Sequence, residues 1–150
     1  MSLNRLINEE RGAALMFVVM MMLVLVIFAG SAMMIFSSNL KQAKHQQDSV
    51  EAYYLAYSGV EMAFTALMAD SKAKTNELVA SVDPNFKLTE NDVALGNGTV
   101  DIIAVKSSDS GFEGWIKITS TAVLTRNNIT YVRSMYFNPA DPNETVWIDG

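Results

Sequence analysis

The stretch that decides the fold is AALMFVVMMMLVLVIFAGSAMMIF, residues 13–36. It is 24 residues long and contains no charged residue, proline, asparagine or glutamine. About 20 such residues are enough for a helix to cross a hydrocarbon core about 30 Å thick. A soluble core helix of this length would carry a polar face, and this stretch has none. We therefore expect residues 13–36 to form a transmembrane helix.

The charges beside this span say little about its orientation. Arg5 and Arg11 precede it and Lys41 and Lys44 follow it, so the residues that set topology are nearly balanced. The short N-terminal arm favours an N-inside arrangement, with the C-terminal domain outside the cytoplasmic (inner) membrane. A secretory signal cleaved within residues 29–32 is the alternative, but such signals have shorter apolar runs, and this run continues through Phe36.

The helix is expected to continue through residues 37–70, because no proline interrupts it. Apolar residues recur there every three to four positions, which predicts an amphipathic helix with one face in the core of a domain. The expected apolar stripe consists of Leu40, Ala43, Val50, Tyr54, Tyr57, Phe64 and Met68.

The C-terminal part has the pattern of strands and turns. Residues 71–98 are rich in turn-forming residues and are expected to be a connecting loop, with room for a short helix at 74–82. Strand-forming residues then dominate 99–106, 114–124 and 129–137, with a possible fourth strand at 145–147. Short turns between them predict antiparallel hairpins in residues 99–150. The expected fold is α+β, a long N-terminal helix packed on an antiparallel sheet of three to four strands.

Composition excludes several functions. The chain has no cysteine, a single histidine (His45) and a net charge of −5. Thiol chemistry is therefore absent, and nucleic acid is not an expected partner because phosphate binding needs clustered Lys and Arg. The carboxylates of Asp83, Glu90 and Asp92 do not have the spacing of a Ca²⁺ loop. We expect no cofactor, no metal site and no catalytic residue, and hence a protein that is not an enzyme.

Two motifs carry a resemblance to a known family. Glu9-Glu10-Arg11-Gly12 directly before the apolar run resembles a class III leader peptide, and SVEAYYLAYSGVEMA, residues 49–63, is similar to a helix of PilX-like minor pilins. The second motif departs from the family pattern at Tyr57-Ser58, where an acidic residue and a small residue are common. Residues 9–68 therefore resemble the type IV pilin superfamily, as a minor pilin or a related minor pseudopilin.

The resemblance implies a structural subunit of a pilus-like filament. Residues 1–12 would be a leader that prepilin peptidase removes after Gly12, and the new N-terminal residue, Ala13, would be methylated. Besides the peptidase, the implied partners are membrane lipid before assembly and other pilins afterwards, through helix–helix packing. Small residues such as Ala14, Gly30 and Ser31 would allow close helix approach in the filament.

Phe17 marks a departure from the major pilins. It is the fifth residue counted from Ala13, where the major pilins carry a glutamate that neutralises the amine of the preceding subunit. The resemblance therefore implies a subunit that initiates the filament or lies near its tip. Type IV pilus, type II secretion and competence filaments remain alternatives, as does an uncleaved single-pass membrane anchor carrying an extracytoplasmic binding domain.

Overall fold

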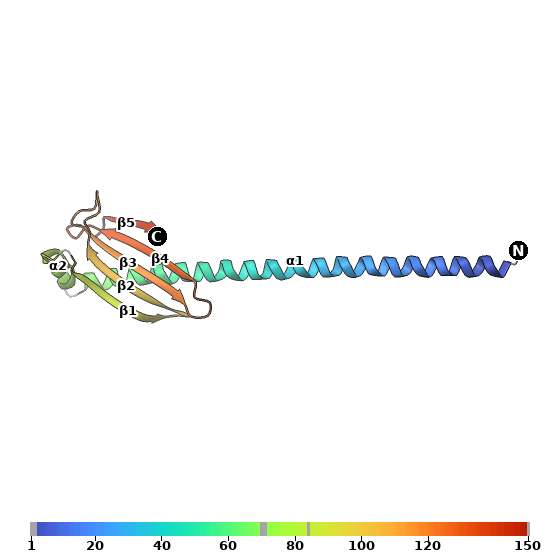
Figure 1. Cartoon of the computed structure of the whole chain (residues 1–150). Helices are drawn as coiled ribbons and strands as arrows, with labels where there is room; N and C mark the ends of the chain where they lie inside the picture. Colours follow the sequence, from blue (N-terminus) through green and yellow to red (C-terminus); the bar gives the residue numbers. More distant parts are fainter. Residues whose placement is uncertain (1–2, 70–71, 84, 150) are drawn as a thin grey trace. The chain divides into compact units, whose positions relative to one another are not determined.

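A computed structural model describes the backbone of residues 3–69, 72–83 and 85–149, with side chains described from residue 14 to residue 148 within those ranges. The chain divides into two compact units, an N-terminal unit of residues 1–45 and a domain of residues 46–150. The elements (Figure 1) are, in order, α1 (Leu3–Met68), α2 (Ala73–Ala80), β1 (Lys87–Leu95), β2 (Gly98–Lys106), β3 (Ile116–Leu124), β4 (Thr130–Phe137) and β5 (Thr145–Asp149).

The described part of the N-terminal unit consists of helix α1 alone. Every side chain from residue 14 to residue 45 is exposed, so no tertiary contact within this unit explains the helix. Leucine, methionine and alanine favour the helical conformation, and no proline interrupts it. The hydroxyl of Ser31 donates a hydrogen bond of 2.9 Å to the carbonyl of Ile27, so this polar side chain is satisfied inside the helix.

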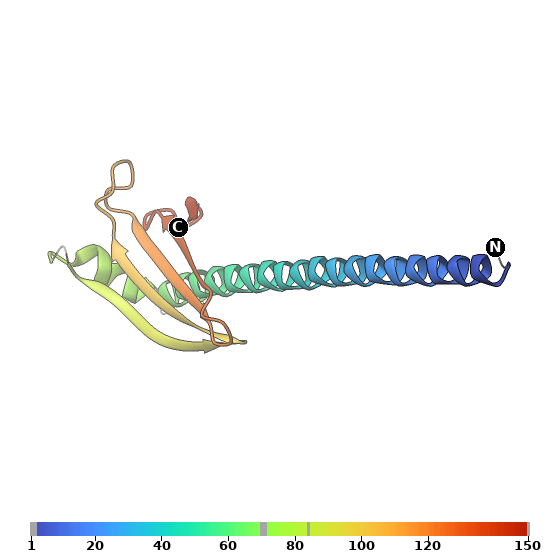
Figure 2. The same cartoon turned by 45° about the vertical axis from the view of Figure 1, so that its right-hand side comes forward.

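The domain contains a five-stranded antiparallel meander in the order β1-β2-β3-β4-β5 (Figure 2). The expected α+β layout is confirmed, but the expected number of three to four strands is wrong. Strands β2 to β5 lie in the expected places, with ends that differ by a few residues. The additional strand is β1, which occupies Lys87–Leu95 inside residues 71–98, expected to be a connecting loop.

Strand β1 escaped the sequence pattern because its middle is polar and irregular. Four consecutive polar residues, Thr89–Asp92, are all exposed. The register with β2 shifts between Glu90 and Val93, which marks a β-bulge. At this bulge Asp92 has a φ of 53°, and its N–H donates a hydrogen bond of 2.8 Å to Oδ1 of Asp101. The bulge breaks the two-residue alternation by which strands are recognised.

Within the domain, residues 46–68 of α1 pack on one face of the sheet through small side chains. The buried positions of this segment are Asp48, Ala52, Ala56, Gly59, Val60 and Leu67. The expected apolar stripe is therefore wrong for Leu40, Val50 and Tyr54, which are each more than half exposed, whereas Phe64 and Met68 pack against the core as expected. Tyr57, Phe64 and Met68 are half-buried and flank the contact face.

Gly59 shows why small residues occupy this face. A Cβ built on Gly59 would lie 2.2 Å from Oγ and 3.1 Å from Cβ of Ser120 on β3. The backbone of α1 therefore approaches the sheet more closely than any larger residue permits. Large side chains are excluded from the centre of the contact and lie at its margins.

The remaining core lies between this helix face and the strands. Side chains alternate along β2 and β3, and the fully buried members include Val100, Ile116 and Ile118. Helix α2 adds Leu78 to the core, and Thr75 Oγ1 donates a hydrogen bond of 2.7 Å to the carbonyl of Leu67. This bond satisfies one of the carbonyls that the C-terminus of α1 leaves open.

Candidate functional site

The first candidate site is the apolar segment of α1. It is the one helix in the described part of the chain that is long and apolar enough to cross a membrane, and none of that apolar window is buried. Its large side chains, from Leu15 to Phe36, are between 48% and 79% exposed. Transfer of such a side chain out of water is favourable by about 1.5–3 kcal/mol, so the segment requires an apolar environment.

The residues predicted to act in assembly lie on this segment without forming one cluster. Ala14 and Phe17 are one helical turn apart, and both are exposed, Phe17 to 62%. Gly30 and Ser31 lie about 20 Å further along the helix, at a rise of 1.5 Å per residue. A Cβ on Gly30 would meet no atom within 4 Å. The side chains at the predicted cleavage point, Gly12 and Ala13, lie outside the described residues.

A second candidate is a polar cluster where α1 meets the turn between β3 and β4. Arg126 donates hydrogen bonds to Oδ1 of Asp48 and, at 3.0 Å, to Oε2 of Glu51. Asn127 donates to the other oxygen of Asp48, and Asn97 donates to Oε1 of Glu51 at 2.7 Å. Because the Asp48 side chain is only 2% exposed, these partners compensate a buried charge. The cluster therefore fastens the turn to the helix.

An arginine on the helix-facing side of the sheet forms a third cluster. The guanidinium of Arg133 lies 4.7 Å from the ring centroid of Tyr53 and 5.1 Å from that of Trp147. It is also 5.9 Å from the centroid of Tyr57, which stacks on Trp147 at 4.7 Å. Aromatic faces attract a cation, so the rings hold the guanidinium in place. The two-residue period of β4 already contained the signal, because it places Arg133 on the same face of the strand as Tyr131 and Met135.

A fourth cluster lies on the other face of the sheet. The hydroxyl of Tyr136 donates to Oδ2 of Asp109, and Nζ of Lys117 lies 3.1 Å from the same oxygen. Phe112 stacks on Tyr136 with ring centroids 4.5 Å apart. The Tyr136 hydroxyl, first, and then Lys117 hold the pKa of the Asp109 carboxyl below its usual value. The side chain of Tyr136, first, and Asp109 raise the pKa of the Lys117 ammonium against the opposing effect of desolvation. A lysine with a raised pKa is not activated as a nucleophile, so the arrangement is suited to holding the loop between β2 and β3.

Comparison with known proteins assigns no family to the chain. No family model matches it, and neither the curated proteins nor the solved structures contain a match. Among the described side chains, no group of three or more His, Cys, Asp or Glu residues is placed to hold a metal ion.

Proposed function

We propose that this chain is a minor pilin, a structural and non-catalytic subunit of a type IV pilus-like filament or of a related pseudopilus. In this proposal prepilin peptidase cuts after Gly12, and the new terminus at Ala13 is methylated. The observation that carries the proposal is the division of α1. One half is apolar and exposed, and the other half is fastened to an antiparallel sheet.

The exposed half supports a role in assembly. A helix that is apolar all round needs lipid or other apolar helices around it. Membrane lipid serves before assembly, and the helices of neighbouring pilins replace it in the filament. Ala14, Gly30 and Ser31 leave room on the helix for such neighbours, as the empty surroundings of Gly30 illustrate.

The second half supports the resemblance to PilX-like minor pilins. Residues 49–63 carry that resemblance, and four of the positions buried against the sheet, Ala52, Ala56, Gly59 and Val60, belong to them. The alternation of small and aromatic residues in this motif therefore has a packing reason in this chain. The small residues set the distance between helix and sheet, and the half-buried Tyr53 and Tyr57 line the margin of the contact.

Phe17 supports a place at the start or the tip of the filament. The mature N-terminal ammonium of a neighbouring subunit is costly to bury without a counter-charge. A phenylalanine at this position offers none, so the subunit fits best where no earlier amine awaits a partner. The proposed location is the cytoplasmic membrane, with the domain on the outer side, and then the filament.

Intact-mass and N-terminal analysis of the full chain, expressed with and without a prepilin peptidase, tests the proposal. The expected result is a peptidase-dependent terminus at Ala13 carrying a methyl group. A Gly12→Leu variant is the matched control and should keep the precursor mass. A wild-type chain that stays intact with active peptidase would contradict the proposal and leave an uncleaved, membrane-anchored binding domain.

The proposed position has its own test. Phe17→Glu restores a carboxylate at the fifth mature residue, so the variant should enter purified filaments in greater numbers than the wild type. Quantitative mass spectrometry of sheared filaments measures this ratio. Unchanged abundance would argue against the tip position.

A further inference from the structure

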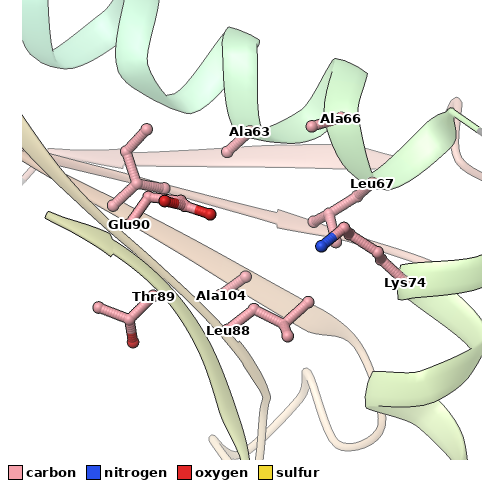
Figure 3. A pocket seen from close by; sticks show the side chains of 9 residues that line it. Ala63, Ala66, Leu67, Lys74, Leu88, Thr89, Glu90 and Ala104 are labelled. Atoms are coloured by element: carbon pink, nitrogen blue, oxygen red, sulfur yellow. The ribbon is translucent and has the colours of Figure 1, made fainter. Parts of the chain in front are cut away.

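A small hollow lies between α1, α2 and the first two strands of the domain (Figure 3). Its volume is about 140 Å³, and its apolar walls include Ala63, Leu67, Leu88, Ile102 and Ala104. The hollow exists because the alanines are too short to fill the space between helix and sheet.

Glu90 also leaves this space open. It pairs with Ile102, a core residue, so the register places it on the helix-facing side of β1. An apolar residue at this position would complete the core. The carboxylate of Glu90 instead remains exposed at the mouth of the hollow.

Two opposite charges face each other across the hollow. Figure 3 shows the ammonium of Lys74, on α2, and the carboxylate of Glu90, on β1, both directed toward the space between them. The ion pairs among the described residues include neither side chain. The mouth therefore presents one cationic and one anionic group that do not neutralise each other by direct contact.

The size of the hollow limits what can enter it. A cavity of about 150 Å³ in a protein core accommodates benzene. The hollow therefore takes one apolar group of the size of a leucine, methionine or phenylalanine side chain. The charges at the mouth complement a ligand that carries a carboxylate and an ammonium group beside that apolar group.

We propose that the hollow binds a free α-amino acid with a medium-sized apolar side chain. Its carboxylate lies against Nζ of Lys74, its ammonium lies against the carboxylate of Glu90, and its side chain fills the hollow. An uncharged occupant, such as an acyl chain, would cover Lys74 and Glu90 without supplying counter-charges, which is unfavourable. The site lies wholly within the domain and does not depend on the pilin proposal.

Ligand-observed NMR on the full chain in lipid nanodiscs tests the site without detergent competing for the hollow. Leucine, methionine and phenylalanine should bind with dissociation constants of about 0.1–1 mM, a range suited to ligands of this size. Glycine, which lacks the apolar group, should bind at least about tenfold more weakly, a difference of about 1.4 kcal/mol. N-acetyl-phenylalanine and phenylalaninamide each lack one charge and should bind more weakly than phenylalanine by a similar factor. Equal binding of the blocked and free compounds, or no binding of any of them, would overturn the proposal.

Variants separate the hollow from nonspecific association. Ala66 lines the hollow and is exposed on α1, so Ala66→Leu should fill the space without disturbing the core and should abolish binding. Glu90→Gln should weaken the binding of phenylalanine about tenfold. It should leave the binding of N-acetyl-phenylalanine unchanged, because that compound has no ammonium group to contact Glu90. Lys87→Gln, on the same strand but outside the hollow, is the matched control and should bind as the wild type does. Binding that survives Ala66→Leu would show that the ligand lies elsewhere and would also overturn the proposal.

Discussion

The two halves of helix α1 differ in which side chains they bury. Between residues 14 and 45 its largest apolar side chains are all exposed, and Gly30 has no neighbour within 4 Å. Between residues 46 and 68 the buried face consists mainly of small residues, and Gly59 is in contact with the sheet. The two glycines have the same side chain and the same helical backbone, yet only one of them is required by its surroundings.

The difference shows that, in residues 46–68, the side of the helix on which a residue lies, rather than its apolar character, decides whether it is buried. Val50 and Tyr54 are more apolar or larger than Ala52 and Ala56, but they remain 54% and 61% exposed. In the N-terminal half, the described residues contact no other element of the chain, so burial does not distinguish small side chains from large ones. The substitutions below test this comparison.

The largest effect is expected from charges at the centre of the apolar segment. Val24→Asp combined with Leu25→Asp should cost about 6 kcal/mol of insertion free energy, since one aspartate at the centre of a span costs about 3 kcal/mol. The double variant should therefore be released from membranes by alkaline carbonate, whereas the wild type stays in the pellet. The control is Val50→Asp with Tyr54→Asp, on the exposed side of the second half, which should remain in the membrane. Retention of the first variant would show that this segment does not anchor the chain.

Overpacking at Gly59 should have the next largest effect. Gly59→Leu forces a side chain into the space held by Ser120, and overpacking of this kind costs about 3 kcal/mol. Denaturant unfolding of the full chain in detergent, followed by the fluorescence of Trp115 and Trp147, measures the loss. Gly30→Leu, in the open half of the same helix, should leave the stability of the domain unchanged. Equal stability of the two variants would contradict the close contact.

The buried carboxylate should contribute somewhat less. Asp48→Ala removes the acceptor of both Arg126 and Asn127, and the expected loss is about 2 kcal/mol because Arg126 is 44% exposed and can return to water. Glu51→Gln, at a carboxylate that is 27% exposed, should cost less than about 1 kcal/mol. The same unfolding measurement ranks the two. A larger loss of stability for Glu51→Gln than for Asp48→Ala would contradict the inference that Asp48 is the main anchor of the turn.

The smallest effect is expected at Asp109, on the solvent side of the sheet. Its folded pKa is below the unfolded value, so its contribution to stability is present above the unfolded pKa of about 3.9 and is lost as the pH falls through the folded pKa. Tyr136→Phe should raise the pKa of Asp109 toward its ordinary value, as NMR titration of the carboxyl carbon would show. An unchanged titration would mean that Lys117 alone depresses the pKa.

Sequence reasoning succeeded where one period persists over many residues. The uninterrupted apolar run predicted the first half of α1, and the two-residue alternation predicted β2, β3 and β4. It failed at β1, where a bulge and four polar residues interrupt the period. Burial against the sheet depends on partners that are distant in sequence, such as Ser120 opposite Gly59, and local spacing does not contain them.

The candidate sites also divide into residues that the sequence indicates and residues that only the fold brings together. Ala14, Phe17, Gly30 and Ser31 were identified from the sequence, and their role in assembly stays a prediction because it depends on other copies or partners. Lys74 and Glu90 are 16 residues apart in the chain and belong to different elements. Only the fold brings them to one hollow, so no local motif could have indicated them.

The bulge in β1 also lies on an edge strand of the sheet, where a second sheet could pair. A straight edge strand offers unpaired N–H and carbonyl groups, on which a second sheet can add. In β1 the register shifts between Glu90 and Val93, and the exposed side chains of Glu90 and Asp92 place negative charge along the same edge. Two copies that approached each other by these edges would meet like charges and mismatched hydrogen-bonding groups. The irregularity that hid β1 from the sequence pattern is thus of the kind that hinders edge-to-edge pairing of sheets.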